Sequence, residues 1–411
     1  MTFSLYSNAD VSGWKVIKGG TGGGGTGGGG TNYAQFTPGS YMLLNLSQGV
    51  RVNNVITVPA WSGYATALGE IKTRSSMTGL QLRFYWNQVE YNKGVYTFDF
   101  IGKALDDFAD TTKVGVNKKI ILLFSVTAST GIAADAAHVV PPYMLSTTSN
   151  KMGPGSDGVN YEGGQWGYDG AGSDGYRIRM TNGNVIARLK LMMTALATYL
   201  RNHANYSSFE SMAFSESAQG AVLAGWTAPP EEPTRANTAS VAMHFDNLVP
   251  ERMTHLMINF PNSTTANPGR IDASIDECRT HKLGFGSPDV FWDSEPLWRL
   301  PDANGNGEGA MRQMSHYEGA RIAQLQGQDQ WCTEFPASGN VYVCPAPGHR
   351  PTFAEHYENL TTILNAHYVV IQRENQTDPN NPSQDLYQTM LNFYNTNRPT
   401  NTTRPTVWKT Y

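Results

Sequence analysis

The sequence predicts an α/β fold, because from about residue 50 short apolar runs alternate with stretches of helical periodicity. Eight such runs have the length of a strand. They are Val50–Val58, Gly79–Tyr85, Lys119–Val126, Phe209–Phe214, His255–Phe260, Leu283–Trp292, Arg321–Gln326 and Tyr368–Gln372. Strands separated by helices pair in parallel, so eight repeats predict a (β/α)8 barrel, or TIM barrel, with long loops after the strands.

The segments between the strands carry helical signals. Apolar residues recur at spacings of three and four after Thr181 and Asn182, two residue types that cap helices, at Val185, Leu189, Met192, Leu196 and Leu200. Similar spacing follows Asp99 and recurs around Phe245 and Leu360. An open doubly wound sheet is the alternative, but the Gly-rich turn typical of that fold does not follow the first predicted strand.

The N-terminal region differs from the rest in composition. Gly19–Thr31 consists of glycine and threonine alone, and such a tract behaves as a flexible loop or linker. Before it, Phe3 to Ile17 alternates weakly and predicts a strand or two. We therefore predict a small β-rich N-terminal extension over residues 1–40 and a barrel over residues 41–411.

Composition restricts the class of partner. Of the 411 residues, 40% are hydrophobic and 16% charged, which is typical of a globular protein. The net charge of −4 is spread along the chain, so we expect neither a nucleic-acid nor a membrane partner. No secretory signal is visible over Met1 to Trp14. The sequence leaves open whether Cys332 and Cys344 form a disulfide.

The most specific stretch is Gly79–Phe100, in which an apolar strand ends at Trp86 and is followed by Glu90, Gly94 and Tyr96 before a helical pattern. It resembles the second βα unit of clan A glycoside hydrolases, the group with many β-galactosidases and cellulases, in which W-x-x-x-E-P-x-x-G-x-Y-x-F-D recurs. Tyr91 stands here in place of the usual proline. The next unit, ending in Pro141-Pro142-Tyr143-Met144-Leu145, is similar to that group's third strand and its P-x-W-L segment.

The resemblance implies a carboxylic acid at the end of the fourth strand, and Glu216 stands there. Such a residue would protonate the leaving oxygen, and barrel active sites lie at these strand ends. Clan A proteins usually carry asparagine before this glutamate, whereas Ser215 precedes it here. A solvated glutamate at the start of a loop is the alternative interpretation.

The resemblance also implies a nucleophilic glutamate at the end of strand seven, and the sequence has none there. Gln324 and Gln326 alternate with apolar residues, a pattern that allows both to point into the barrel. An amide, however, cannot form a glycosyl ester. Three explanations stay open: an inactive Glu-to-Gln form with Gln326 at the nucleophile position, a nucleophile elsewhere, or a barrel that binds glycans without cleaving them. The other candidate carboxylates are Asp293, Glu295, Asp329 and Glu374.

Residues at the ends of the predicted strands supply candidates for sugar binding. Trp residues offer flat faces for stacking on sugar rings. We predict substrate contacts from Trp86, Arg83, Trp292, Glu295 and Trp331; core packing or a structural ion pair is the alternative for each. The histidines show no metal-ligand spacing, and we expect no metal and no cofactor.

These observations predict a retaining glycosidase that cleaves an oligo- or polysaccharide, with Glu216 as acid/base and strand seven carrying the nucleophile. A phage or bacterial polysaccharide depolymerase acting outside the cell, secreted or on a phage particle, fits the Gly-rich N-terminal attachment. The alternatives are a catalytically inactive glycan-binding barrel and a structural particle protein. Release of reducing sugar separates the first from the other two.

Overall fold

The computed structural model describes most of the chain after residue 33. The described residues are 34–45, 51–52, 55–56, 63–128, 140–147, 153–161, 165–170, 173–215, 221–222, 231–258, 269–288, 290, 310–325, 353–373, 377–378, 381–398 and 400–409. By its contacts the chain divides into Met1–Asn32 and Tyr33–Tyr411, and the second of these units contains the barrel.

Eight parallel strands close into a barrel, as the sequence predicts. Around the barrel the order is β1-β14-β13-β12-β11-β9-β5-β4, and β4 pairs again with β1. The strands are β1 (Gly39–Asn45), β4 (Met77–Phe84), β5 (Lys119–Ser125), β9 (Phe209–Ser215), β11 (Met253–Met257), β12 (Gly284–Ser287), β13 (Arg321–Leu325) and β14 (Tyr368–Gln372). The fold is therefore a (β/α)8 barrel.

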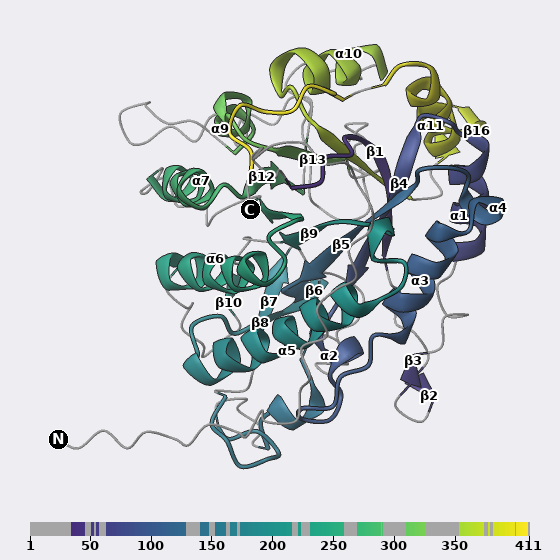
Figure 1. Cartoon of the computed structure of the whole chain (residues 1–411). Helices are drawn as coiled ribbons and strands as arrows, with labels where there is room; N and C mark the ends of the chain where they lie inside the picture. The colour runs from purple at the N-terminus through teal and green to yellow at the C-terminus, as the bar shows by residue number, and fades with distance from the viewer. Residues whose placement is uncertain are drawn as a thin grey trace, which may run out of the picture. The chain divides into compact units, whose positions relative to one another are not determined.

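Helices connect successive strands and surround the barrel (Figure 1). The principal ones are α1 (Tyr64–Thr73), α3 (Asp99–Ala109), α5 (Gly183–Asn202), α6 (Glu231–Leu248), α7 (Gly269–His281), α9 (Ala310–His316), α10 (Phe353–Glu358) and α11 (Leu386–Thr396). The helix predicted from Val185 is α5. Its N-cap is Asn182, whose side chain accepts hydrogen bonds from the backbone N–H groups of Asn184 and Val185.

The first barrel strand is not where the sequence pattern put it. Within Val50–Val58, β2 (Arg51–Val52) and β3 (Val55–Ile56) pair with each other in antiparallel fashion instead. Gly39–Asn45 forms the barrel strand because both of its faces are apolar, so it can be buried on both sides, as parallel strands are. The boundary predicted at residue 40 consequently falls inside β1.

Residues of each strand alternate between two apolar layers. Inward positions form one cluster, which includes Tyr41, Leu43, Ile121, Leu123, Ile322 and Val370. The intervening residues pack against the helices in a larger cluster, which includes Met42, Leu44, Ile120, Leu122, Ala323 and Leu325. This alternation places Gln324 on the inner side of β13, as predicted.

The N-terminal end of the barrel is closed by segments from both ends of the described chain. Trp408 donates its indole N–H to the carbonyl of Ala34 at 2.9 Å, and its ring packs against Phe36 with the centroids 4.8 Å apart. Below the strands, the buried carboxylate of Glu210 accepts hydrogen bonds from Gln35, the backbone N–H of Thr37 and the Tyr368 hydroxyl.

A β-bulge positions Glu210. Ile120 pairs with Phe209, whereas the next residue, Ile121, pairs with Ser211, so Glu210 is the extra residue of β9. Bulges redirect a side chain relative to the regular alternation. Here the bulge accompanies a glutamate that binds the segment preceding β1.

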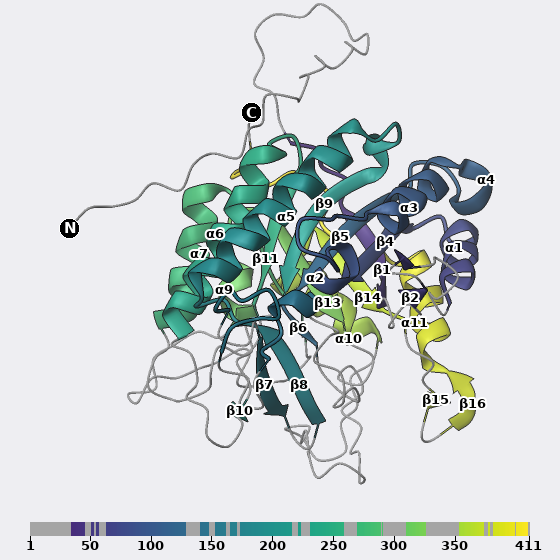
Figure 2. The ribbon, with the colours of Figure 1, turned by 90° about the horizontal axis from the view of Figure 1, so that it is seen from below.

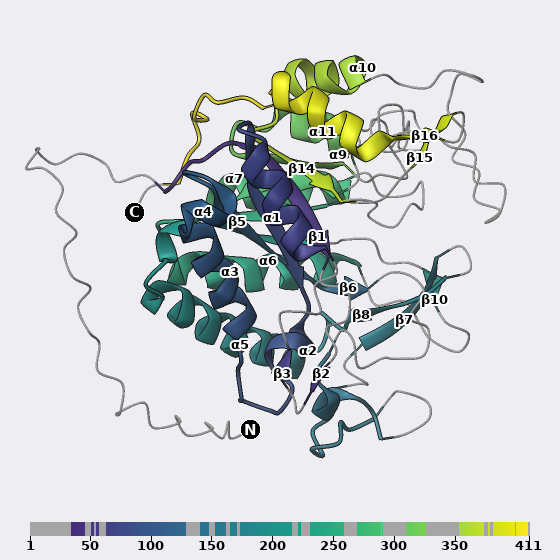
Figure 3. The same ribbon diagram turned by 90° about the vertical axis from the view of Figure 1, so that its right-hand side faces the viewer.

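Two small antiparallel sheets lie at the other end, the mouth formed by the carboxyl ends of the strands (Figures 2 and 3). The larger has the order β10-β7-β8-β6 and consists of β6 (Thr127–Ala128), β7 (Gln165–Gly170), β8 (Ser173–Ile178) and β10 (Ala221–Val222). The smaller pairs β15 (Thr377–Asp378) with β16 (Asn381–Asp385). We call the larger one the mouth sheet.

Candidate active site

Polar residues occupy the inner side of the barrel near the mouth. Arg83 on β4, Ser125 on β5, Ser215 on β9 and Gln324 on β13 are all at or near the last residue of their strand, and each is no more than 9% exposed. In clusters of this kind a ligand entering the mouth meets hydrogen-bonding groups rather than an apolar core. Arg83 lies on the inner face near the mouth, and its contact with substrate stays a prediction.

The predicted catalytic residues Glu216 and Gln326 come directly after β9 and β13, two of the strands that carry these polar residues. Ser215 ends β9 directly before Glu216, and Leu325 ends β13 directly before Gln326. Glu216 and Gln326 themselves lie outside the described residues. So do the predicted sugar-binding residues Trp292, Glu295 and Trp331 and the alternative carboxylates Asp293, Asp329 and Glu374. Their roles stay predictions.

Trp86 has a different environment from the predicted one. Its side chain is fully buried, and the indole N–H donates to Glu90 Oε2 at 2.7 Å. A ring without an exposed face cannot stack on a sugar. We therefore correct the expectation of a sugar platform: Trp86 packs the loop between β4 and α3.

Glu90 explains the spacing of the motif that begins at Trp86. Its fully buried carboxylate also accepts the backbone N–H of Gly94 at 2.7 Å, and Gly94 has a φ of 74°, a conformation that glycine adopts without strain. The backbone of Glu90 also forms an isolated antiparallel β-bridge with that of Tyr96. In this chain Trp86, Glu90, Gly94 and Tyr96 therefore fold one loop around one carboxylate.

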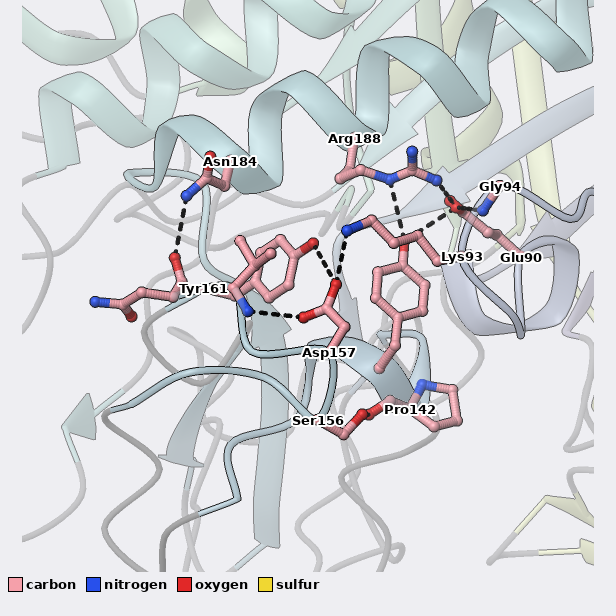
Figure 4. A network of polar contacts seen from close by, with 12 residues as sticks. Glu90, Lys93, Gly94, Pro142, Ser156, Asp157, Tyr161, Asn184 and Arg188 are labelled. Atoms are coloured by element: carbon pink, nitrogen blue, oxygen red, sulfur yellow. Dashed lines mark hydrogen bonds and ion pairs between the residues drawn. The ribbon is translucent and has the colours of Figure 1, made fainter.

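A second loop and a helix are joined to the same carboxylate (Figure 4). Arg188 of α5 forms a hydrogen-bonded ion pair with Glu90, and Tyr143 donates to Glu90 at 3.0 Å. Arg188 also donates to the hydroxyls of Tyr143 and Tyr96 at 3.2 Å each. Burial lowers the pKa of Arg188 and raises the pKa of Tyr143. The loops after strands two and three are therefore fixed to one helix.

The network continues toward solvent through Asp157. Its carboxylate pairs with Lys93 at 2.8 Å and accepts from the hydroxyl of Tyr161 at 3.2 Å (Figure 4). Burial raises the pKa of Asp157, but the hydrogen bonds from Lys93, Val159 and Tyr161 outweigh it, and the net shift is downward. These contacts join Asp157 to Lys93 of the loop after β4 and to Tyr161. Sequence reasoning missed them, because Asp157 and Arg188 carry no motif of their own.

The mouth sheet adjoins the end of β9, the strand that Glu216 follows. The backbone N–H of Val126 donates to the carbonyl of Ser215 at 3.1 Å, and that of Ile178 donates to the carbonyl of Val126 at 2.7 Å. The base of the sheet is thus bonded to the ends of β5 and β9. Its edge strand β10 comes shortly after Glu216 in the chain and pairs Val222 with Tyr168.

Metal ligation and membrane insertion have no support among the described residues. No group of three or more His, Cys, Asp or Glu side chains is arranged to hold a metal ion within the described ranges. Among the helices in that part of the chain, none combines the length and the apolar character needed to cross a membrane.

Comparison with known proteins finds similar solved structures but no match by sequence. No family model and no curated protein matches the sequence. A β-galactosidase from the psychrophilic Marinomonas ef1 is similar at 10% identity and a TM-score of 0.47, over 87% of this chain and 59% of that chain. A glycoside hydrolase family 5 enzyme from Prevotella bryantii is similar at 10% identity and a TM-score of 0.46, over 88% of this chain and 99% of that chain.

A D-psicose 3-epimerase from Clostridium cellulolyticum is similar too, at 8% identity and a TM-score of 0.39, over 86% of this chain and 94% of that chain. Sugar-cleaving and sugar-epimerising enzymes thus both resemble this chain. Likeness at this level does not select an activity, since one barrel hosts many. The residues at the mouth are the better guide to function.

Proposed function

We propose that the protein is a glycoside hydrolase that cleaves an oligo- or polysaccharide at the mouth of the barrel. The observation that carries the proposal is the position of Glu216, directly after the last residue of a strand whose carboxyl end opens at the mouth. That is where barrel enzymes hold their reactive groups. A carboxylic acid there is the group needed to protonate a glycosidic oxygen.

The mouth sheet supports a glycan as the substrate. The strand β7 contains two aromatic residues, Trp166 and Tyr168. In the register Trp166 is opposite Arg177, and Tyr168 is opposite Gly175. Aromatic and arginine residues are common in sites that bind sugar rings and hydroxyls. A sheet of this composition beside the end of β9 suits a long glycan better than a single sugar.

The amides of strand seven favour a second candidate, a barrel that binds glycans without cleaving them. Gln324 lies on the inner face and Gln326 follows the strand, where a retaining enzyme needs a carboxylate. Both candidates share the ligand and differ in whether a bond is broken.

A panel of polysaccharides tests the proposal with the full chain and two variants. We expect the parent to release reducing sugar from at least one polysaccharide, and Glu216→Gln to lose about 10²- to 10⁴-fold in rate while still binding it. Glu210→Gln is the matched control, because Glu210 lies at the opposite end of the same strand, and it should keep the parental rate at a temperature where it is folded.

Binding without any release, by parent and variants alike, would support the second candidate. Neither binding nor release across a broad panel would exclude both. If the Glu216→Gln variant cleaved the glycan at the rate of the parent, Glu216 would not be the acid, and the other carboxylates would be tested next.

A further inference from the structure

The interior of this barrel contains polar side chains with no hydrogen-bond partner in the described part of the chain. The atoms are both amide atoms of Gln81 and of Gln324, both ring nitrogens of His255, and the hydroxyls of Ser211 and Ser215. All five residues are at most 1% exposed. Barrel interiors are usually filled by branched apolar residues, so this set requires an explanation.

The strand register places all five residues on the inner face. Gln81 lies opposite Ile121 and Leu43, and Ser211 lies between Ile121 and Met253, which belong to the inner apolar cluster. His255 contacts Tyr368 with the ring centroids 5.1 Å apart. The interior of an eight-stranded barrel is only wide enough for side chains, so these groups converge on a narrow space.

The His255 ring occupies space next to Gly284, its neighbour on strand β12, where a side chain would clash with it. A Cβ on Gly284 would lie 2.0 Å from His255 Nδ1, so this position of β12 accepts only glycine while the imidazole stays where it is. Burial lowers the pKa of His255 to about 3, with a smaller contribution from His367. The ring is therefore neutral at pH 7 and offers one donor and one acceptor.

The chemistry of the set identifies what it binds. Two amides, two hydroxyls and a neutral imidazole carry no net charge, which suits neither a metal ion nor an anion. Each offers donors and acceptors in a space closed at the N-terminal end by Glu210, Gln35 and Thr37. A small neutral molecule that both donates and accepts, and that enters from the mouth, matches these requirements.

We propose that the barrel encloses ordered water bound by the inward-facing side chains of Gln81, Ser211, Ser215, His255 and Gln324. A buried water makes about three hydrogen bonds, so the eight unpartnered atoms correspond to about two or three waters. Because Ser215 ends β9, the cluster of side chains reaches the mouth, and the bound waters exchange with solvent there. The inference is independent of the proposed function and holds whether or not the mouth cleaves glycans.

Oxygen-17 relaxation dispersion, which counts slowly exchanging waters, tests the proposal together with a crystal structure at high resolution. The key variant is the double substitution Gln81→Met and Gln324→Met, which nearly keeps side-chain volume and removes both amides. Leu123→Met is the control, since it changes an inner residue of the same barrel without removing a polar group. We expect the double variant to lose slowly exchanging waters and the control to keep them.

Thermal unfolding separates a hydrated interior from a dry one. If water satisfies the amides, removing amide and water together should leave Tm within about 2 °C of the parent or lower it. If the amides are dry and unpaired, their removal should raise Tm. A raised Tm with an unchanged water count, or a parent with no internal water density, would overturn the proposal. The single Gln324→Met variant gives the same comparison if the double variant does not fold.

Discussion

Glu210 lies in β9 and Glu216 follows the last residue of that strand, and we propose that the two have different tasks. Glu210 binds the chain segment before β1 through two donors, Gln35 and Thr37. Glu216 follows the other end of that strand, where a reacting group is useful. The difference arises from the direction of a parallel barrel, in which one end is free for loops to build a site.

Gln326 provides the sharpest test of the proposed chemistry. A retaining mechanism requires a carboxylate that this sequence lacks at the end of strand seven. Replacing Gln326 with glutamate supplies it, and glutamate is nearly isosteric with glutamine. We expect Gln326→Glu to gain retaining activity on the order of 10³-fold or more, the scale of dependence on a nucleophile. Turnover and the anomer of the product, followed by NMR, give the result.

Gln324→Glu is the control for this experiment. It places a carboxylate two residues earlier, inside the barrel at a position that is fully buried, so it should destabilise the fold without creating activity. A parent that is already active with Gln326, or a Gln326→Glu protein that binds glycan and does not cleave it, would contradict the assignment.

His255 makes folding stability depend on pH. Its pKa is about 3 in the folded protein and 6.5 ordinarily, so below pH 6.5 the unfolded chain binds the proton that the folded chain excludes. The free energy of unfolding is therefore highest above pH 6.5 and falls as pH decreases toward 3, by about 2 kcal/mol between pH 7 and pH 5.

Chemical denaturation of parent and His255→Asn across pH 5 to 7 measures this effect. His367, whose pKa burial lowers to about 4, contributes a similar slope in both proteins. We expect the variant to lose roughly half of the slope. Equal slopes in the two proteins would show that His255 is protonated to the same extent in the folded and unfolded states.

Among the elements, α5 does more than cover the barrel. Through Arg188 it holds Glu90 of the loop after β4 and Tyr143 of the loop after β5. A buried carboxylate that loses its cation is left as an uncompensated charge, which costs more than the pair contributes when intact. The rim of the mouth thus depends on one helix.

We expect Arg188→Met to lower the free energy of unfolding by about 3–5 kcal/mol. Adding Glu90→Gln should recover part of the loss, because the uncompensated charge is removed. Lys93→Met is the comparison, since Lys93 is exposed and its pair with Asp157 should contribute at most about 1 kcal/mol. Urea denaturation gives all four values. An equal effect of Arg188→Met and Lys93→Met would show that burial does not make the Arg188 pair more important.

At the scale of the whole molecule, the two ends of the barrel are separate in role. The segment from Ala34 to Thr37 and the residues around Trp408 close the N-terminal end, while the mouth sheet lies at the other. Changes before Ala34 should therefore affect anchoring or assembly, not the candidate site.

Two truncations test this separation. Deleting residues 1–31 should leave Tm within about 2 °C of the parent and keep glycan binding. Deleting residues 1–38 also removes Gln35 and Thr37, which leaves the buried Glu210 with only the Tyr368 hydroxyl of its three donors. This deletion should lower Tm by several times this margin of about 2 °C. A folded 1–31 deletion that no longer binds glycan would show that the N-terminal region contributes to the site.

The sequence by itself determined seven of the barrel strands, several of the helices between them and the inward position of Gln324, because alternation and helical spacing are local properties of the chain. Only the tertiary structure decided that Gly39–Asn45 closes the barrel, since two apolar segments competed and pairing with β14 and β4 selects one. It also decided that Trp86 and Glu90 support a loop. Their partner Arg188 lies 98 residues from Glu90, and no local pattern reveals such a contact.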